Sequence, residues 1–187
     1  MVFDAIILAG AHSARLNGAD KAQLDVGGET LLQRAVDAVK GAGTTVAVGP
    51  VRDGGLPVIW VQEHPPGGGP VAALAAGLDA VQSDLVAVLA VDHPLLTSQD
   101  IEGLLLAVSV DGAAAKGSSG RIEPLLAVYR RRSLQTALDE IDVLDGARMQ
   151  DLIGALDVDL VDLGTAARDC DTWEEIDAVR KLAGSRR

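Results

Sequence analysis

The sequence predicts a doubly wound α/β fold, in which helices cover both faces of a mostly parallel sheet. Short apolar runs alternate with segments whose apolar residues recur at helical spacing, which is typical of βαβ units. Some of these runs are apolar on both faces, as strands of a covered parallel sheet are. The 187 residues suffice for a sizeable core, and no linker or internal repeat divides them. We therefore expect a single domain over residues 1–187.

The first half of the chain is predicted to alternate regularly between strand and helix. The opening run, residues 2–9, is apolar except for Asp4, and two shorter apolar runs follow at 44–48 and 58–61. A helix at 29–40 has its apolar residues on one stripe and ends at two glycines. A second helix, at 71–81, is rich in alanine and follows Pro70, which suits a first helical turn.

The second half contains the best candidate for the central strand. Residues 85–91, LVAVLAV, are continuously apolar and lie between Asp84 and Asp92. A helix capped by Thr97 or Ser98 follows and reaches about residue 109. The spacing of Thr172 and Glu175 predicts a capping box before a last helix. The remaining predicted elements are strands at 112–116, 122–129 and 158–163, and helices at 133–142, 147–156 and 173–182.

Composition and charge restrict the class of protein. Apolar residues make up 48% of the chain and aromatic residues 2%, which indicates a globular protein with an aliphatic core. Lysine and arginine number 16 against 27 acidic residues, giving a net charge of −11, so we expect no nucleic-acid partner. A small phosphorylated ligand remains compatible with this charge, because it needs only a local positive pocket.

Neither a disulfide nor a membrane segment is expected. Cys170 is the only cysteine, so no internal disulfide can form. The N-terminus lacks a basic segment and Asp4 interrupts its apolar run, which argues against a signal peptide. No apolar run approaches the roughly 20 residues that cross a bilayer. We expect a soluble, cytoplasmic protein with no membrane partner.

Two loops lie where such a fold binds ligands, beyond the carboxyl ends of the strands. One is the opening loop, residues 9–21, and the other is VDHP, residues 91–94, which places Asp92 at the end of the predicted central strand. The opening loop matches neither GxxxxGK[ST] nor GxGxxG. The generic phosphate motifs therefore leave its ligand undecided.

The residue types in these loops suit a nucleoside triphosphate with Mg²⁺. Small residues at positions 9–11 permit close approach of a phosphate to backbone N–H groups. Arg15 can bind phosphate oxygens through its planar fork, and Lys21 can act as a point charge. An isolated carboxylate such as Asp92 suits Mg²⁺, which is commonly held by one or two carboxylates together with substrate phosphates. A solvated loop and an ordinary strand-end aspartate fit the same residues.

The segments also resemble, in order, those of the molybdenum cofactor guanylyltransferases and their nucleotidyltransferase relatives. LAGAHSARLNGADKAQLDVGGETLL is similar to the family's opening LAGG, S-x-R-M/L-G, DK and G-x-x-L. GGGPVAALAAGL, VLAVDHPLL, EPLLAVYR and DCDTWEEID resemble the later GP-L-A-G-L, C/G-D-x-P-F/L, P-L-x-A-x-Y/V and N-x-N-T-P-E-D-L segments. The resemblance covers nearly the whole chain.

The resemblance implies a three-layer α/β/α, Rossmann-like nucleotidyltransferase with a mostly parallel sheet. Members of this family join GTP to molybdopterin or its molybdenum-loaded form and release pyrophosphate with Mg²⁺. The implied nucleotide-binding and catalytic residues are Leu8, Ala9, Gly10, Ala11, Arg15, Lys21, His64 and Asp92. Asp92 would hold the metal, and Gly69 and Pro70 would shape the wall of the site. Asp171 and Thr172 match the closing segment, which is associated with the pterin side.

The chain departs from the family pattern at several of these positions. Ala11 replaces the second glycine of LAGG, and His64, next to Glu63, occupies the place of an acidic residue before the GP loop. Asp169 and Asp171 stand where asparagines are usual. Their carboxylates would repel an anionic pterin phosphate unless they bind metal or face away.

Alternative functions remain open at this point. Cytidylyl or other nucleotidyl transfer to a different phosphorylated acceptor fits the same residues, and so does a nucleotide-binding protein with impaired catalysis. A dehydrogenase-like domain is disfavoured by the lack of GxGxxG. We interpret His12, His64 and His93 as surface or structural residues, with His93 only flanking Asp92, and Cys170 as inert.

Overall fold

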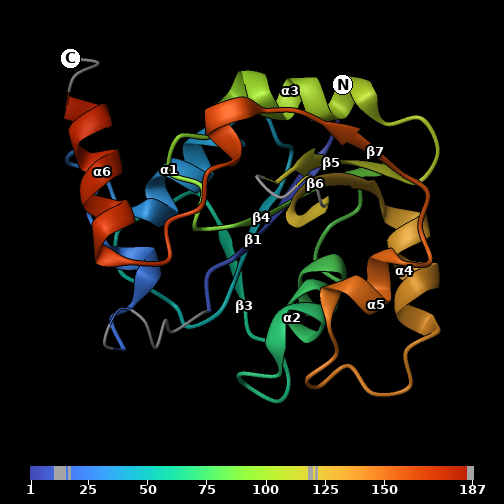
Figure 1. Cartoon of the computed structure of the whole chain (residues 1–187). Helices are drawn as coiled ribbons and strands as arrows, with labels where there is room; N and C mark the ends of the chain where they lie inside the picture. Colours follow the sequence, from blue (N-terminus) through green and yellow to red (C-terminus); the bar gives the residue numbers. More distant parts are fainter. Residues whose placement is uncertain (11–15, 17, 118–119, 121, 185–187) are drawn as a thin grey trace.

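The computed structural model contains a seven-stranded sheet between two layers of helices (Figure 1). It describes residues 1–10, 16, 18–117, 120 and 122–184. The strands are β1 (Asp4–Leu8), β2 (Thr45–Val48), β3 (Ile59–Val61), β4 (Leu85–Ala90), β5 (Gly112–Lys116), β6 (Ile122–Arg130) and β7 (Val158–Val161). The α-helices are α1 (Leu31–Ala38), α2 (Gly69–Leu78), α3 (Ser98–Ala107), α4 (Arg131–Asp139), α5 (Met149–Ile153) and α6 (Trp173–Gly184).

The predicted α/β fold is confirmed, and every predicted helix and strand is present with its ends shifted by a few residues. The strand order is β3-β2-β1-β4-β6-β5-β7, which makes β4 the central strand, as its unbroken apolar run predicted. All neighbouring strands are parallel except those that pair with β6, which runs antiparallel to β4 and β5. Two 3-10 helices, Lys21–Gln23 (η2) and Gly164–Ala167 (η3), lacked a recognisable pattern in the sequence.

The sheet buries apolar side chains on both faces. Along β1, Ala5 and Ile7 belong to a cluster shared with α1, α3 and α6, while Ile6 and Leu8 belong to one shared with α2, α4 and α5. Figure 1 shows the same division, with α2, α4 and α5 on one side of the sheet and α1, α3 and α6 on the other. This double covering explains why the strands lack a polar face.

Asp4, the polar residue in the opening run, is buried because the backbone satisfies its carboxylate. Its Oδ1 accepts a hydrogen bond from Thr44 N at 2.9 Å, and its Oδ2 accepts from Gln82 N at 2.9 Å and Ser83 N at 2.8 Å. Burial raises the pKa of this carboxyl, but the three backbone N–H groups together outweigh burial and lower it. Asp4 thus joins the chain before β2 and before β4 to the start of β1.

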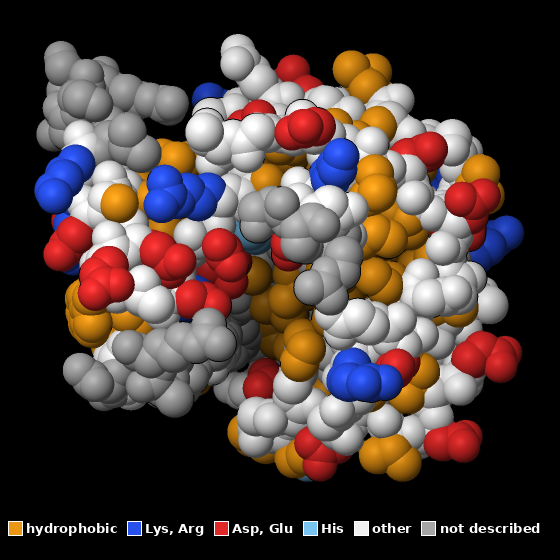
Figure 2. Space-filling view, in the orientation of Figure 1, with side chains coloured by type: hydrophobic (Ala, Val, Ile, Leu, Met, Phe, Trp, Pro, Cys, Tyr) orange, Lys and Arg blue, Asp and Glu red, His pale blue; other side chains and the backbone are white. Residues whose placement is uncertain are grey.

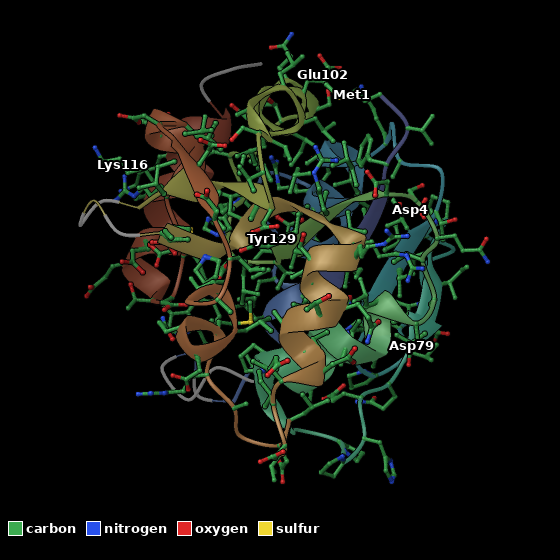
Figure 3. The ribbon with its side chains drawn as sticks, turned by 90° about the vertical axis from the view of Figure 1, so that its right-hand side faces the viewer. Met1, Asp4, Asp79, Glu102, Lys116 and Tyr129 are labelled. Carbon is green, nitrogen blue, oxygen red and sulfur yellow. The ribbon has the colours of Figure 1, made fainter. Side chains whose placement is uncertain are left out.

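The amino ends and the carboxyl ends of the parallel strands lie on opposite sides of the molecule. Figure 3 shows Asp4, at the amino end of β1, and Lys116, at the carboxyl end of β5, on opposite sides of the molecule. The register pairs Leu8 of β1 with Ala90 of β4, so these two parallel strands end side by side. Within the described part of the chain, no helix is long and apolar enough to cross a membrane.

Candidate nucleotide site

The candidate site lies where β1 and β4 end together. Ala9 continues β1 as a buried residue, and its N–H donates to Val48 O at 2.8 Å. Gly49 has a φ of +136°, and a Cβ there would lie 2.7 Å from both N and Cα of Gly10. A glycine is therefore required where the chain leaving β2 crosses the start of the opening loop. Leu8, Ala9 and Gly10 consequently stand at the carboxyl edge, where the sequence placed them.

Lys21 is the buried cation of the site. It starts η2, which is capped by Asp20 through a hydrogen bond from Ala22 N to Asp20 Oδ1 at 3.2 Å. Only 4% of Lys21 is exposed, and its Nζ lies 2.6 Å from Asp171 Oδ1 and 3.5 Å from Asp92 Oδ2. The structure therefore brings together Lys21 and Asp92, two residues predicted to act jointly, and adds a second carboxylate.

One carboxylate oxygen of Asp92 accepts no hydrogen bond from the described residues. Its Oδ2 faces Lys21, whereas its Oδ1 is buried without a hydrogen-bond partner among the described residues. His93 Nε2 lies 3.3 Å from this Oδ1, and His93 Nδ1 also lacks a partner in the same part of the chain. His93 is thus buried beside Asp92, and its role there stays a prediction. A buried carboxylate oxygen without a partner is unfavourable unless a ligand or ion completes it.

Asp171 is held in place by the capping box that the sequence predicted. Glu175 Oε2 accepts hydrogen bonds from the N–H groups of Asp171 at 2.8 Å and Thr172 at 2.9 Å, and Glu175 N donates to Thr172 Oγ1 at 3.3 Å. The N–H of Asp171, the largest contribution, lowers the pKa of the Glu175 carboxyl. The ordered start of α6 therefore aims Asp171 at Lys21.

Before the GP loop, the buried acid is Glu63, whereas His64 is exposed. Glu63 Oε1 accepts from Gly67 N at 2.9 Å and lies 3.8 Å from the position that a Cβ on Gly10 would occupy. The family resemblance assigns this place to His64, with Glu63 only as its neighbour. An acid two positions before the Pro-Pro-Gly-Gly-Gly run was the signal that could have found Glu63.

A pocket of about 440 Å³ has Asp92 in its lining. Figure 2 shows a hollow near the centre of this face, with acidic side chains gathered on one side of it. The polar residues and the predicted wall residue that line the pocket are Pro70, Asp92, His93, Glu123, Arg148, Gln150 and Asp169. Arg148 is a cation in this lining, and both its Nε and Nη2 already bind Asp151, at 3.0 and 2.8 Å.

The described residues contain no group of three or more histidine, cysteine or acidic side chains that could hold a metal ion by themselves. Asp92, with its unpartnered Oδ1, fits a Mg²⁺ that takes most of its oxygen ligands from substrate phosphates. Cys170 is fully buried, and burial, the largest cause, raises the pKa of its thiol to about 11. A protonated thiol is a poor nucleophile, which supports an inert Cys170.

Comparison with known proteins identifies the family. The model of the MobA-like NTP transferase domain matches residues 5–159. The chain belongs to the MobA-like NTP transferase family. It is therefore a member of a nucleotidyltransferase family, as the resemblance predicted.

Individual relatives agree with this family. The chain is 33% identical over 144 residues to a Chloroflexus aggregans protein named probable molybdenum cofactor guanylyltransferase, covering 72% of this chain and 68% of that one. The structure of molybdopterin-guanine dinucleotide biosynthesis protein A from Archaeoglobus fulgidus has a TM-score of 0.77 at 18% identity, covering 97% and 99% of the two chains. A Thermus thermophilus 2-C-methyl-D-erythritol 4-phosphate cytidylyltransferase has a TM-score of 0.74 at 20% identity, covering 98% and 100%. The fold is shared, and it does not distinguish guanine from cytosine.

Asp171, which binds Lys21, lies outside residues 5–159, the part of the chain that the family model matches. Ala11 and Arg15, two predicted nucleotide-binding residues, lie outside the described part of the chain, so their roles stay predictions. The structure therefore places Leu8, Ala9, Gly10, Lys21 and Asp92 at one edge and leaves His64 exposed beside it.

Proposed function

We propose that this MobA-like transferase moves GMP from GTP to the terminal phosphate of molybdopterin, or of its molybdenum-loaded form, and releases pyrophosphate in the cytoplasm. The observation that carries the proposal is the meeting of the buried Lys21 Nζ with Asp92, whose Oδ1 accepts no hydrogen bond from the described part of the chain and has only His93 Nε2 beside it, at 3.3 Å. A buried ammonium suits a triphosphate, and a strand-end carboxylate suits the Mg²⁺ that accompanies it.

The reaction needs no covalent intermediate on the protein. An oxygen of the acceptor phosphate attacks the α-phosphorus of GTP, and the bond from that phosphorus to the oxygen bridging the β-phosphate breaks. Pyrophosphate leaves with the electron pair of that bond. Catalysis then consists of holding the two phosphates in line and neutralising their charge.

Each residue has a part in this arrangement. Backbone groups of Leu8, Ala9 and Gly10 would bind the nucleotide, and Lys21 would neutralise the β- and γ-phosphates. Asp92 would hold Mg²⁺, which when bound supplies positive charge to the triphosphate. Arg15 stays a predicted supporting cation.

The pocket beside Asp92 is proposed to receive the acceptor. It adjoins the proposed metal ligand directly, so a phosphate at its mouth would lie next to the nucleotide phosphates. Arg148 at the pocket offers positive charge, while Glu123 and Asp169 offer carboxylates to ring N–H groups such as those of a pterin.

Glu63 is our candidate for recognising guanine, although its Oε1 already accepts from Gly67 N at 2.9 Å and its Oε2 from Gln62 Nε2 at 2.6 Å, so the base would have to share or replace these hydrogen bonds. A carboxylate accepts two hydrogen bonds side by side, and guanine presents such a pair at N1–H and its 2-amino group. Cytosine lacks an adjacent donor pair of this kind. The position of Glu63 against Gly10 places it next to the proposed nucleotide backbone contacts.

The test is pyrophosphate release from GTP, CTP and ATP with Mg²⁺, each with and without molybdopterin. We expect release with GTP only when molybdopterin is present, and a larger rise in melting temperature with GTP than with ATP. Release with CTP instead would make the chain a cytidylyltransferase. GTP binding without release under any condition would favour the binding protein with impaired catalysis.

A further inference from the structure

Arg52, which follows β2, is nearly enclosed although it is charged. Its side chain is 7% exposed. Nε donates to Asp20 Oδ2 at 2.7 Å, and Nη2 donates to Asp20 Oδ1 at 2.9 Å and to Ala9 O at 2.7 Å. Nη1 donates to Pro50 O at 3.0 Å, and the guanidinium carbon lies 5.7 Å from the ring centroid of Trp60. Almost every donor of this guanidinium is therefore used within the protein.

The partners of Arg52 are the two ends of the opening loop. Ala9 is the last residue before Gly10, and Asp20 is the residue before Lys21. The Arg52 guanidinium thus fixes the distance between the Ala9 carbonyl, at the start of the loop, and the Asp20 carboxylate, near its end. Lysine could not replace this contact, because an ammonium cannot bind a carboxylate and a carbonyl through one rigid planar fork.

Asp20 passes this constraint on to Lys21. The oxygen that binds Arg52 Nη2, Oδ1, also caps η2 by accepting from Ala22 N at 3.2 Å. Two further hydrogen bonds, from Gln23 N to Asp20 O at 3.0 Å and from Leu24 N to Lys21 O at 3.2 Å, complete the turn. The orientation of this turn decides whether the Lys21 ammonium faces Asp92. The chain of contacts therefore runs from Arg52 through Asp20 to the nucleotide cation.

From these contacts we infer that Arg52 is a positioning residue for nucleotide binding, acting through Asp20 on Lys21 without touching the nucleotide. The inference rests on the proposed function for the identity of the ligand, while the contacts themselves do not depend on it. Neither the sequence patterns nor the family resemblance assigned a role to Arg52.

The matched control is Arg130, which lies beside the amino end of β4, away from the carboxyl ends that carry the site. Arg130 also binds a carbonyl and a carboxylate, since Nε donates to Val110 O at 2.7 Å and Nη1 to Asp84 Oδ2 at 3.1 Å. Its neighbour in the register is Leu85, the first residue of β4, so it lies far from the strand ends that carry the site. Arg52→Lys and Arg130→Lys therefore each remove a guanidinium that binds a carbonyl and a carboxylate, although Arg130 is 39% exposed and Arg52 only 7%.

The experiment measures GTP affinity in the presence of Mg²⁺ by calorimetry, together with melting temperature. We expect Arg52→Lys to weaken GTP binding about tenfold or more, because a small displacement of a charged group is costly at such a site. Arg130→Lys should leave the affinity unchanged. In the Lys21→Ala background, Arg52→Lys should cause no further loss beyond about twofold, because both changes then remove one interaction.

Wild-type affinity in Arg52→Lys would overturn the inference. Full, independent losses from Arg52→Lys and Lys21→Ala would overturn it too, because Arg52 would then affect binding by a route other than Lys21. A measurement without ligand tests the positioning role separately from the proposed function. Hydrogen exchange of the backbone amides of Ala22, Gln23 and Leu24 should be faster in Arg52→Lys than in the wild type, and unchanged in Arg130→Lys. If the wild type bound no GTP, the proposed function would fail, and unchanged exchange at these amides would still refute the positioning role.

Discussion

Lys21 and Asp171 stand 150 positions apart in the chain, yet the lysine Nζ lies 2.6 Å from an oxygen of the aspartate. The same Nζ is 3.5 Å from Asp92. The protein thus places an anion of its own against the cation that we assign to the triphosphate. A nucleotide must compete with Asp171 for Lys21, and this competition can be measured.

Asp171→Asn should tighten GTP binding measured without metal by about three- to tenfold, since a partly exposed ion pair contributes about 1 kcal/mol. The amide removes the competing charge while keeping the size of the side chain. Calorimetry in the presence of a chelator measures the change. Asp169→Asn, in the same segment but in the acceptor pocket, is the control and should leave this affinity unaltered. Weaker binding by Asp171→Asn would show that the carboxylate assists the nucleotide.

Asp92→Asn should reduce pyrophosphate release about a hundredfold or more, the range typical of losing one group that stabilises developing charge. The fold should persist, because the amide fills the same space at the end of β4. Initial rates and the melting temperature report the two effects separately. Asp84→Asn changes a carboxylate at the opposite end of the same strand and should keep full activity. A fully active Asp92→Asn enzyme would place the metal ligand elsewhere.

Glu63→Gln should weaken GTP binding about tenfold and leave ATP binding nearly unchanged, because an amide can accept only one of guanine's two hydrogen bonds and a charged bond contributes about 1.5–3 kcal/mol. Direct titrations with both nucleotides give the ratio. His64→Asn is the matched variant for the alternative assignment. If His64→Asn lowered the GTP preference and Glu63→Gln did not, the base contact would belong to the histidine.

Asp4→Asn should lower the free energy of unfolding at neutral pH by about 1–3 kcal/mol, since the amide cannot accept equally well from three backbone N–H groups. The pKa of Asp4 is lowered in the folded protein, so its stabilising effect is complete above the unfolded value of about 3.9 and is lost as the pH falls through the lowered pKa. Urea unfolding at a series of pH values should show the wild type and Asp4→Asn converging in acid. The exposed Asp142→Asn should run parallel to the wild type, and a gap between Asp4→Asn and the wild type that persisted in acid would contradict the assignment.

The fold could be predicted from the sequence because its strands are buried on both faces. An apolar run such as residues 85–90 has few alternatives to a central strand, and β4 occupies that place. The exception, Asp4, could not be understood from the run alone, since its partners Thr44, Gln82 and Ser83 lie far along the chain. The 3-10 helix η2 was missed because a single turn has no periodicity to detect.

The sequence predicts those site residues whose positions are determined by the carboxyl ends of the strands. Lys21 and Asp92 follow adjacent parallel strands, so the rule that ligands bind at carboxyl ends brings them together. Glu63 lies near Gly10, and Arg52 binds Ala9 and Asp20, all in the opening loop. Such contacts between distant segments cannot be predicted from a local sequence pattern. Asp171 reaches Lys21 only because α6 packs where it does, which depends on the whole tertiary structure.

The pair of Lys21 and Asp171 also sets an order of assembly. Synthesis proceeds from the N-terminus, so a growing chain contains its nucleotide cation long before the aspartate that neutralises it. Until the segment that begins α6 has been translated and docked, Lys21 lacks Asp171, which is nearer to its Nζ than Asp92 is. In a nascent chain this position therefore faces other anions before its own carboxylate arrives, and the last helix to be synthesised closes that interval.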